Sequence, residues 1–254
     1  MLVDLKKFSV LVCGCARDVE PQLPGVLANF ARIGALFGAA RYAVVENDSK
    51  DRTAAMLASW KRSDPRPRRH ISLTGLDRRF RTRTERLPEC RNALLDELWR
   101  EPADFMVMLD MDGICQEPIP EASIQSCFNY PLDGWAAMTA NISSKYYDIW
   151  ALRSEWCPYD CWQKVWHRPA GMTPEEAIEQ FIHVHKKHIP ANAPPLEVES
   201  AFGGLGVYQV SFLKGCRYSR KSTFHDADVE HCAFNQAIRR NGGKVFINPA
   251  LIIR

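Results

Sequence analysis

The sequence predicts an α/β fold, a single domain with a mostly parallel central sheet flanked by helices. Apolar runs of strand length alternate with segments of helical periodicity through the first half of the chain, and this alternation is typical of sheets whose strands are connected by helices. Residues 104–109 (DFMVML) are apolar after the first position, as expected for a central parallel strand covered on both faces. Because the 254 residues show no internal repeat or interdomain linker, we expect one domain over 1–254.

The elements of the first half follow from these patterns in order. Residues 8–15 form an apolar run that indicates a buried strand. The apolar side chains between Leu23 and Phe37 recur at three- and four-residue steps, which indicates an amphipathic helix. Pro88 is tolerated in the first turn of a helix, so we place a helix start there. The remaining elements are a strand at 41–46, a helix at 53–60, a short strand at 71–73, a helix at 88–99 and the strand at 104–109.

The second half is less regular. Thr173 is followed by proline and two glutamates, a sequence that favours the start of a helix. The glycines of segment 202–208 (FGGLGVY) indicate positive φ angles or a close approach of the backbone. The other expected elements are a strand at 135–139, a helix at 228–240 that ends at two glycines, and a last strand at 244–253.

Charge is concentrated in one segment. The formal net charge is +3, but residues 61–91 hold eleven Lys and Arg against four Asp and Glu. The rest of the chain is net acidic. A function that explains this sequence must therefore use or tolerate a dense arginine segment.

Composition and cysteine usage exclude several classes. The hydrophobic fraction of 46% and charged fraction of 25% are those of a globular protein, not of a disordered or fibrous one. We find no integral membrane span, because no apolar run reaches about 18–20 residues. The nine cysteines follow no disulfide framework, which favours reduced thiols. We expect a cytoplasmic protein, free or peripheral to a membrane. Cys157, Cys161 and His167 lack a convincing fourth zinc ligand.

The strongest chemical signal is the pair Asp110 and Asp112, in the sequence LDMDG directly after a predicted buried strand. In an open α/β sheet, ligands bind beyond the carboxyl ends of the strands. Two carboxylates two residues apart can approach one divalent ion, which prefers oxygen ligands. An acidic turn without a ligand is the alternative.

A second polar cluster, Glu46, Asn47 and Asp48, follows the strand at 41–46. Carboxylates and amides at a strand end suit a ribose or nucleobase, which offers hydroxyl and N–H groups. The alternative is a capping role, in which Ser49 or Asp51 caps the helix that begins near residue 53.

These two motifs, in this order, resemble the nucleotide-sugar glycosyltransferases of the GT-A type. The segment 202–208 resembles their glycine-rich segment, and Glu230-His231-Cys232-Ala233-Phe234 with the residues after it resembles their acid-bearing helix and final strand. More narrowly, that motif and 146–153 (YYDIWALR) are similar to motifs of fungal capsule-associated α-1,3-mannosyltransferases. Where many inverting relatives have Glu-Asp, this chain has Glu-His, which leaves the base and the stereochemistry open.

The resemblance implies a Rossmann-like GT-A fold with a nucleotide-binding half over about 1–115 and an acceptor half over about 116–254. It implies a hexose transfer, with mannose suggested by the narrower family, from a GDP- or UDP-sugar to a glycan or glycolipid acceptor, dependent on Mn²⁺ or Mg²⁺. The implied donor-binding residues are Glu46, Asn47, Asp48, Arg91, Asp110, Gly203 and Gly204, and the implied metal ligands are Asp110, Asp112, His225 and His231.

Roles for the remaining residues are more open. Arginine recognises phosphate in a bidentate manner. Arg81, Arg83, Arg86 and Arg91 lie before the predicted metal strand, where a loop and helix would let them face a diphosphate, and we favour Arg91 over the proline-flanked arginines. For an inverting reaction, Glu230 is the first candidate for the general base and Asp148 the second; for a retaining one, Asp148 or the backbone near Gly203 would line the sugar. Four tryptophans are equally consistent with core packing and with stacking on sugar rings: Trp150, Trp156, Trp162 and Trp166.

Two other functions compete with this interpretation. A sugar-phosphate nucleotidyltransferase would share the α/β frame, but the first predicted strand carries only Gly14 where a glycine-rich phosphate loop is expected. A nucleic-acid-binding module would interleave arginine with aromatic residues, and Phe80 is the sole aromatic residue between positions 61 and 91. We therefore expect a nucleotide-sugar partner and no nucleic acid.

Overall fold

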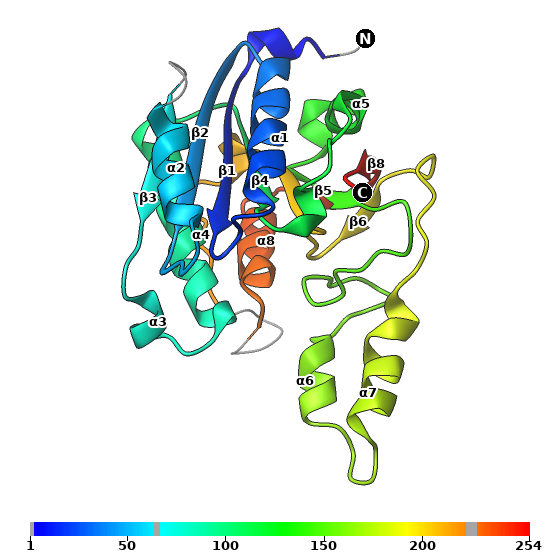
Figure 1. Cartoon of the computed structure of the whole chain (residues 1–254). Coiled ribbons are helices and arrows are strands. Elements are labelled where there is room, and N and C mark those ends of the chain that lie inside the picture. Colours follow the sequence, from blue (N-terminus) through cyan, green and yellow to red (C-terminus); the bar gives the residue numbers. More distant parts are fainter. Residues whose placement is uncertain (1–2, 63–66, 222–227) are drawn as a thin grey trace.

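A computed structural model describes residues 3–62, 67–221 and 228–254. In these residues eight strands form one mixed sheet, in the order β3-β2-β1-β4-β7-β5-β8-β6 (Figure 1). No helix of this described part is long and apolar enough to cross a membrane. All nine cysteines are free.

The first half of the chain forms the parallel part of the sheet. β1 pairs in parallel with β2 and β4, and β2 pairs in parallel with β3. Successive side chains of a strand point to opposite faces, so Val10 and Val12 join one core and Leu11 and Cys13 the other. These four strands are β1 (Ser9–Ala16), β2 (Ala39–Glu46), β3 (Arg68–Ser72) and β4 (Phe105–Asp110).

Helices cover both faces of this half. α1 buries Val26, Phe30 and Ile33 in the core of one face, whereas α4 buries Leu94 and Leu98 in the core of the other. The helices of this half are α1 (Leu23–Leu36), α2 (Thr53–Arg62), α3 (Leu76–Arg79) and α4 (Arg83–Arg100). The prediction that α4 begins at Pro88 is wrong: Thr82 and Glu85 form a capping box at its start, so Pro88 lies inside the helix.

The second half makes the sheet mixed. β7 (Leu205–Gln209) lies antiparallel between β4 and β5 (Ala137–Asn141), and β6 (Leu196–Val198) is antiparallel to β8 (Val245–Ile252). β5 and β8 pair in parallel. The sheet thus has more antiparallel character than the sequence predicts, because part of the glycine-rich segment is itself a central strand.

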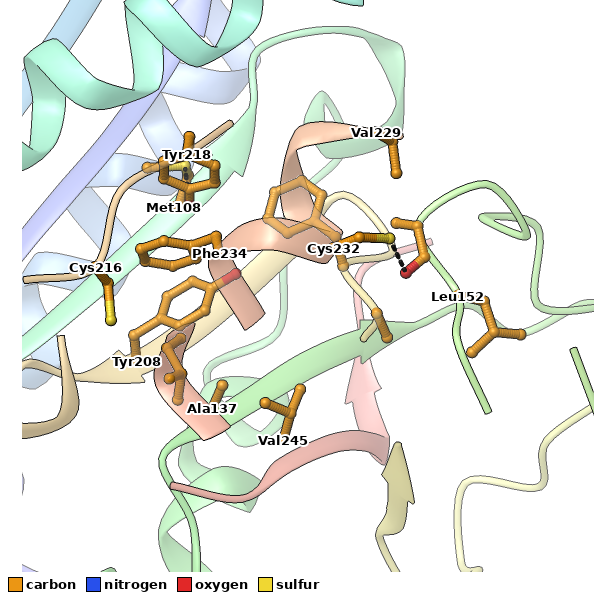
Figure 2. Packing of buried hydrophobic residues seen from close by; sticks show 14 of the residues in the cluster. Met108, Ala137, Leu152, Tyr208, Cys216, Tyr218, Val229, Cys232, Phe234 and Val245 are labelled. Carbon is orange, nitrogen blue, oxygen red and sulfur yellow. Dashed lines mark hydrogen bonds between the residues drawn. The ribbon is translucent and has the colours of Figure 1, made fainter. Parts of the chain in front are cut away.

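Helix α8 (Glu230–Arg240) packs on the same face as α4. Its Phe234 ring stacks on Tyr218 at 4.0 Å between ring centroids, and the edge of Tyr208 meets it at 5.5 Å (Figure 2). The Tyr218 hydroxyl donates to the sulfur of Met108 on β4. This aromatic packing fixes the amino end of α8 near the end of β4.

Two helices stand apart from the sheet. α6 (Cys161–Trp166) and α7 (Pro174–Phe181) pack against each other and project as an arm (Figure 1). As predicted, Thr173 caps α7, through a capping box with Glu176. The remaining helix, α5 (Glu121–Gln125), lies near α1. We refer to α6, α7 and their connection as the helical arm.

Candidate active site

Two adjacent pockets lie beyond the carboxyl ends of β1, β2 and β4. The first, which we call the β1 pocket, lies against residues 15–19 and Asn47. The second, the α8 pocket, lies against the start of α8 and the segment 147–151. Four residues line both: Arg83, Leu87, Asp110 and Asp112.

The two aspartates of the predicted metal motif therefore stand between the pockets. Asp110 ends β4, and its backbone N–H donates to the carbonyl of Gly204 at 2.8 Å. Burial raises the pKa of Asp110 to about 6; Arg91 opposes this shift and Asp112 adds to it. Asp112 is exposed and caps a short 3₁₀ turn by accepting from the backbone N–H of Ile114 at 3.1 Å.

These carboxylates fit a divalent cation that takes its other ligands from substrate and water. Within residues 3–62, 67–221 and 228–254, no three His, Cys, Asp or Glu side chains are arranged to hold a metal ion. Two carboxylates with open positions suit Mg²⁺ or Mn²⁺ bound together with phosphate. His225 lies outside the described residues.

Of the three polar residues at the end of β2, the structure brings Asn47 to the β1 pocket. Glu46 is buried and fixes a loop, since its carboxylate accepts from the Ser49 N–H at 2.7 Å and from the Ser72 hydroxyl at 2.9 Å. Asp48 has a positive φ of 50° and accepts from the N–H groups of Gly75 and Asp77. These bonds outweigh burial and lower the pKa of Asp48. Glu46 and Asp48 therefore hold loops in place, and neither lines the β1 pocket.

Asp18 is a pocket residue that the sequence patterns did not identify. It follows β1 at a positive φ of 51° and accepts from the Lys50 N–H at 2.6 Å. Next to it, the carboxylate of Glu20 accepts from the Arg52 N–H at 2.9 Å. These bonds join the loop after β1 to the loop after β2, and they hold Asp18 against the pocket. Its position directly after a buried parallel strand is the signal that could have found it.

Arg91 lies in the α8 pocket and is almost fully buried. Its Nε donates to Glu230 Oε1 at 2.9 Å and its Nη2 to Asp110 Oδ1 at 3.2 Å. The guanidinium lies over the rings of Phe202 and Tyr218. Burial alone would lower the pKa of Arg91, but the pairing with Glu230 and Asp110 raises it. Arg91 thus joins the carboxylates of Glu230 and Asp110, and the arginines that line the β1 pocket are Arg17, Arg83 and Arg86.

Glu230 and His231 form the wall of the α8 pocket at the start of α8. Glu230 Oε2 and both ring nitrogens of His231 are buried without a hydrogen-bond partner among the described residues. The His231 ring stacks on Phe202 at 3.9 Å between centroids. Burial, with help from Arg91, lowers the pKa of His231 well below its usual value, so the imidazole is neutral. Its Nε2 lies 3.7 Å from Glu230 Oε1.

Asp148 lines the same pocket but has both carboxylate oxygens engaged. Oδ2 accepts from the Gly203 N–H at 2.8 Å and Oδ1 from the Ala151 N–H at 3.3 Å. Burial raises the pKa of Asp148 against these bonds. Gly203 and Gly204, with φ of 68° and 90°, line neither pocket and act through their backbone: Gly203 holds Asp148, and Gly204 holds Asp110.

No family model and no curated protein matches the sequence. Among solved structures, the chain is similar to the mannosyltransferase PcManGT from Pyrobaculum calidifontis in complex with GDP-Man and Mn²⁺, with 15% identity and a TM-score of 0.54 over 96% of this chain and 56% of that one. It is also similar to S. aureus TarS in complex with UDP, with 11% identity and a TM-score of 0.53 over 94% of this chain and 57% of that one. The chain spans little more than half the length of these structures. It therefore has an α/β fold of the GT-A glycosyltransferase type.

Proposed function

We propose that this protein is a metal-dependent glycosyltransferase that transfers a hexose from a nucleoside-diphosphate sugar to a hydroxyl acceptor. One observation carries the proposal: Asp110 and Asp112 stand between a pocket lined by arginines and a pocket lined by Glu230 and Asp148. A transferase of this kind needs that order, with a diphosphate on one side of a cation and a group that can accept a proton on the other.

The donor binds in the β1 pocket. Asn47 and Asp18 offer an amide and a carboxylate to the nucleoside, while Arg83 and Arg86 face the diphosphate. Mn²⁺ or Mg²⁺ held by Asp110 and Asp112 would supply Lewis acidity that stabilises the charge developing on the leaving phosphate. Of the similar structures, PcManGT is in complex with GDP-Man and Mn²⁺ and TarS is in complex with UDP, which supports this donor class. We favour mannose because of the motifs shared with fungal capsule-associated mannosyltransferases.

The acceptor binds in the α8 pocket. In the reaction, the acceptor oxygen forms a bond to the anomeric carbon, the bond from that carbon to the phosphate oxygen breaks, and the acceptor proton moves to the protein. Glu230 is the residue we assign to take this proton in an inverting reaction, because Oε2 has no partner among the described residues, whereas both oxygens of Asp148 accept backbone bonds. Arg91 orients Glu230 through Oε1.

A donor screen tests the proposal. Thermal shift and release of nucleoside diphosphate are measured for UDP- and GDP-sugars, with and without Mn²⁺. We expect one donor to stabilise the protein and to be hydrolysed slowly, and we expect both effects only when Mn²⁺ is present. Absence of any metal-dependent response to either donor class would refute the proposed function.

The matched variant is Asp112→Asn. The side chain is exposed, and asparagine retains a cap for the turn that follows, so the thermal stability without ligand stays at the wild-type level. Mutating a residue that only hydrogen-bonds to a metal ligand costs about 10–100-fold in affinity or activity. Loss of Asp112, a proposed ligand itself, should therefore reduce turnover by about a hundredfold or more. Wild-type turnover in this variant would contradict the metal assignment.

A further inference from the structure

Three tryptophans contact one another where the α8 pocket meets the helical arm. The ring of Trp150 meets the edges of Trp162 and Trp166, each at 6.2 Å between centroids. Trp162 and Trp166 lie stacked on α6 at 6.1 Å. Because the three separations are nearly equal, the rings form a compact triangle. We call Trp150, Trp162 and Trp166 the tryptophan cluster.

One member of the tryptophan cluster is part of the α8 pocket. Trp150 lines this pocket together with Asp148 and Glu230, the two carboxylates that face the acceptor in the proposed reaction. An acceptor whose reactive hydroxyl lies at Glu230 would therefore have its next units beside Trp150. The β1 pocket, proposed for the donor, is lined by none of the three tryptophans.

Another member of the tryptophan cluster is exposed. Trp166 is 53% exposed, whereas the side chains at Val165 and Cys161 on the same helix are buried. Cys161 and Val165 thus supply the buried contacts of α6. An indole whose only role was packing would be buried as they are, so the exposure of Trp166 indicates a further role. Aromatic rings present a flat face with partial negative charge, to which polarised C–H groups and apolar surfaces bind.

The chemistry of the arm favours a neutral ligand. The arm carries charges of both signs: Glu175, Glu176 and Glu179 are exposed on α7, Lys164 is exposed on α6, and Arg168 follows α6. This mixture lacks the excess of basic residues that attracts a protein to an anionic lipid surface. Its carboxylates can accept hydrogen bonds from sugar hydroxyls, and its cationic groups can donate to them. A chain of neutral sugars combines the apolar ring faces and the hydroxyl donors that the arm can bind.

We propose that the tryptophan cluster is an acceptor subsite that binds a neutral glycan chain extending from the α8 pocket onto the helical arm. The proposal rests on the proposed function, since it assigns the α8 pocket to the acceptor. It predicts that the protein recognises several sugar units of the acceptor and not only the unit that is glycosylated.

The test compares Trp166→Ala with Trp99→Ala. Trp99 is also an exposed tryptophan, at 38%, but it lies near the end of α4 opposite to the pocket-lining residues of that helix. Binding is measured on arrayed neutral oligosaccharides and by affinity electrophoresis in gels that contain mannan, dextran or laminarin. We expect the wild type and Trp99→Ala to bind one of these glycans, Trp166→Ala to bind it about tenfold more weakly, and Trp166→Phe to recover part of the affinity.

Each result decides the question. The proposal is overturned if the wild type binds none of these glycans, or if Trp166→Ala binds them as the wild type does. If binding to phosphatidylserine vesicles depended on Trp166 and glycan binding did not, the tryptophan cluster would instead be assigned to a membrane. Thermal shift by UDP or GDP with Mn²⁺ is recorded for every variant. A missing nucleotide response in the wild type contradicts the proposed function, whereas a normal response in Trp166→Ala with lost glycan binding supports the subsite.

Discussion

Arg91 and Arg83 show how burial separates two roles within one basic segment. Arg91 is buried and donates to Glu230 and Asp110, so its charge is largely compensated inside the protein. Arg83 is exposed and lines both pockets beside Asp110. An incoming diphosphate needs a cation that is free to turn toward it, and bidentate contact with phosphate is what a guanidinium offers. We therefore propose Arg83, and not Arg91, for the phosphate contact.

Replacing Arg83 should weaken donor binding without unfolding the protein. Loss of one hydrogen bond to a charged group costs about 1.5–3 kcal/mol, so Arg83→Ala should raise the dissociation constant for GDP or UDP with Mn²⁺ roughly ten- to a hundredfold. Calorimetric titration measures this change. Arg79→Ala is the control, because Arg79 is exposed on α3, belongs to the same basic segment and lines neither pocket. Equal losses in both variants would mean that the segment acts only through its general positive charge.

At the level of elements, the turn before β7 connects the two halves of the site through its backbone. Gly203 and Gly204 adopt positive φ angles, which an L-residue adopts at a cost of about 1–2 kcal/mol. A Cβ on Gly203 would also collide with the carbonyl oxygen of Ala140. The same two residues bond to Asp148 and Asp110. Strain at this turn should therefore reach both carboxylates.

Gly203→Ala should reduce both stability and turnover. We expect a loss of about 2–4 kcal/mol in the free energy of unfolding, from the backbone strain together with overpacking, and a lower rate of metal-dependent donor hydrolysis. Gly242→Ala is the control, since Gly242 has a φ of 82° but open space around its Cβ position. It should lose only the backbone part and keep its activity. Urea unfolding and product release measure the two effects, and equal losses of stability would show that the Ala140 carbonyl moves aside.

The elements that the sequence predicted correctly are those with a strong local pattern. The strands β1, β2 and β4 with helix α1 lie within two residues of their expected bounds, because each is a continuous apolar run or a clear helical period. For segment 202–208 the sequence indicated only positive φ angles or a close backbone approach, although its second part is β7. A central antiparallel strand flanked by two glycines gives no alternating pattern, and its neighbours β4 and β5 lie far away in the sequence.

The site was predictable to the same extent. Asp110 and Asp112 could be found because their position depends on one strand end. Glu46 and Asp48 looked equivalent to Asn47, but their partners are Ser72 and the backbone at Gly75. Those contacts depend on how β3 and α3 fold back on the loop. No local sequence pattern shows which polar side chains of such a cluster form hydrogen bonds within the protein and which remain available to a ligand.

At the scale of the whole molecule, the pair of Arg91 and Glu230 joins the two halves of the chain. Arg91 comes from α4, which covers the parallel half, and Glu230 begins α8, which follows the antiparallel strands. The two residues are 139 positions apart in the sequence. Since both residues line the α8 pocket, the contact that joins the two halves of the chain also orients the proposed base.

A double-mutant cycle tests this connection. Arg91→Met leaves Glu230 and Asp110 without their buried counter-charge, and removal of one member of such a pair costs about 3–5 kcal/mol of unfolding free energy. Adding Glu230→Gln should recover part of that loss, because a neutral amide no longer needs the guanidinium. We expect a coupling energy of about 1–3 kcal/mol between the two sites, measured by urea unfolding without metal ions.

Arg217→Met with Asp96→Asn forms the matched cycle. Asp96 is also on α4, but this ion pair is exposed on both sides, and such pairs contribute about 0.2–1 kcal/mol. A coupling at Arg91 and Glu230 clearly above that of the exposed pair would show that the halves of the molecule are joined through the buried contact. If instead the two cycles gave equal couplings, the amino end of α8 would be held by the packing of Phe234 and Tyr218, and Arg91 would serve to orient Glu230 without stabilising the fold.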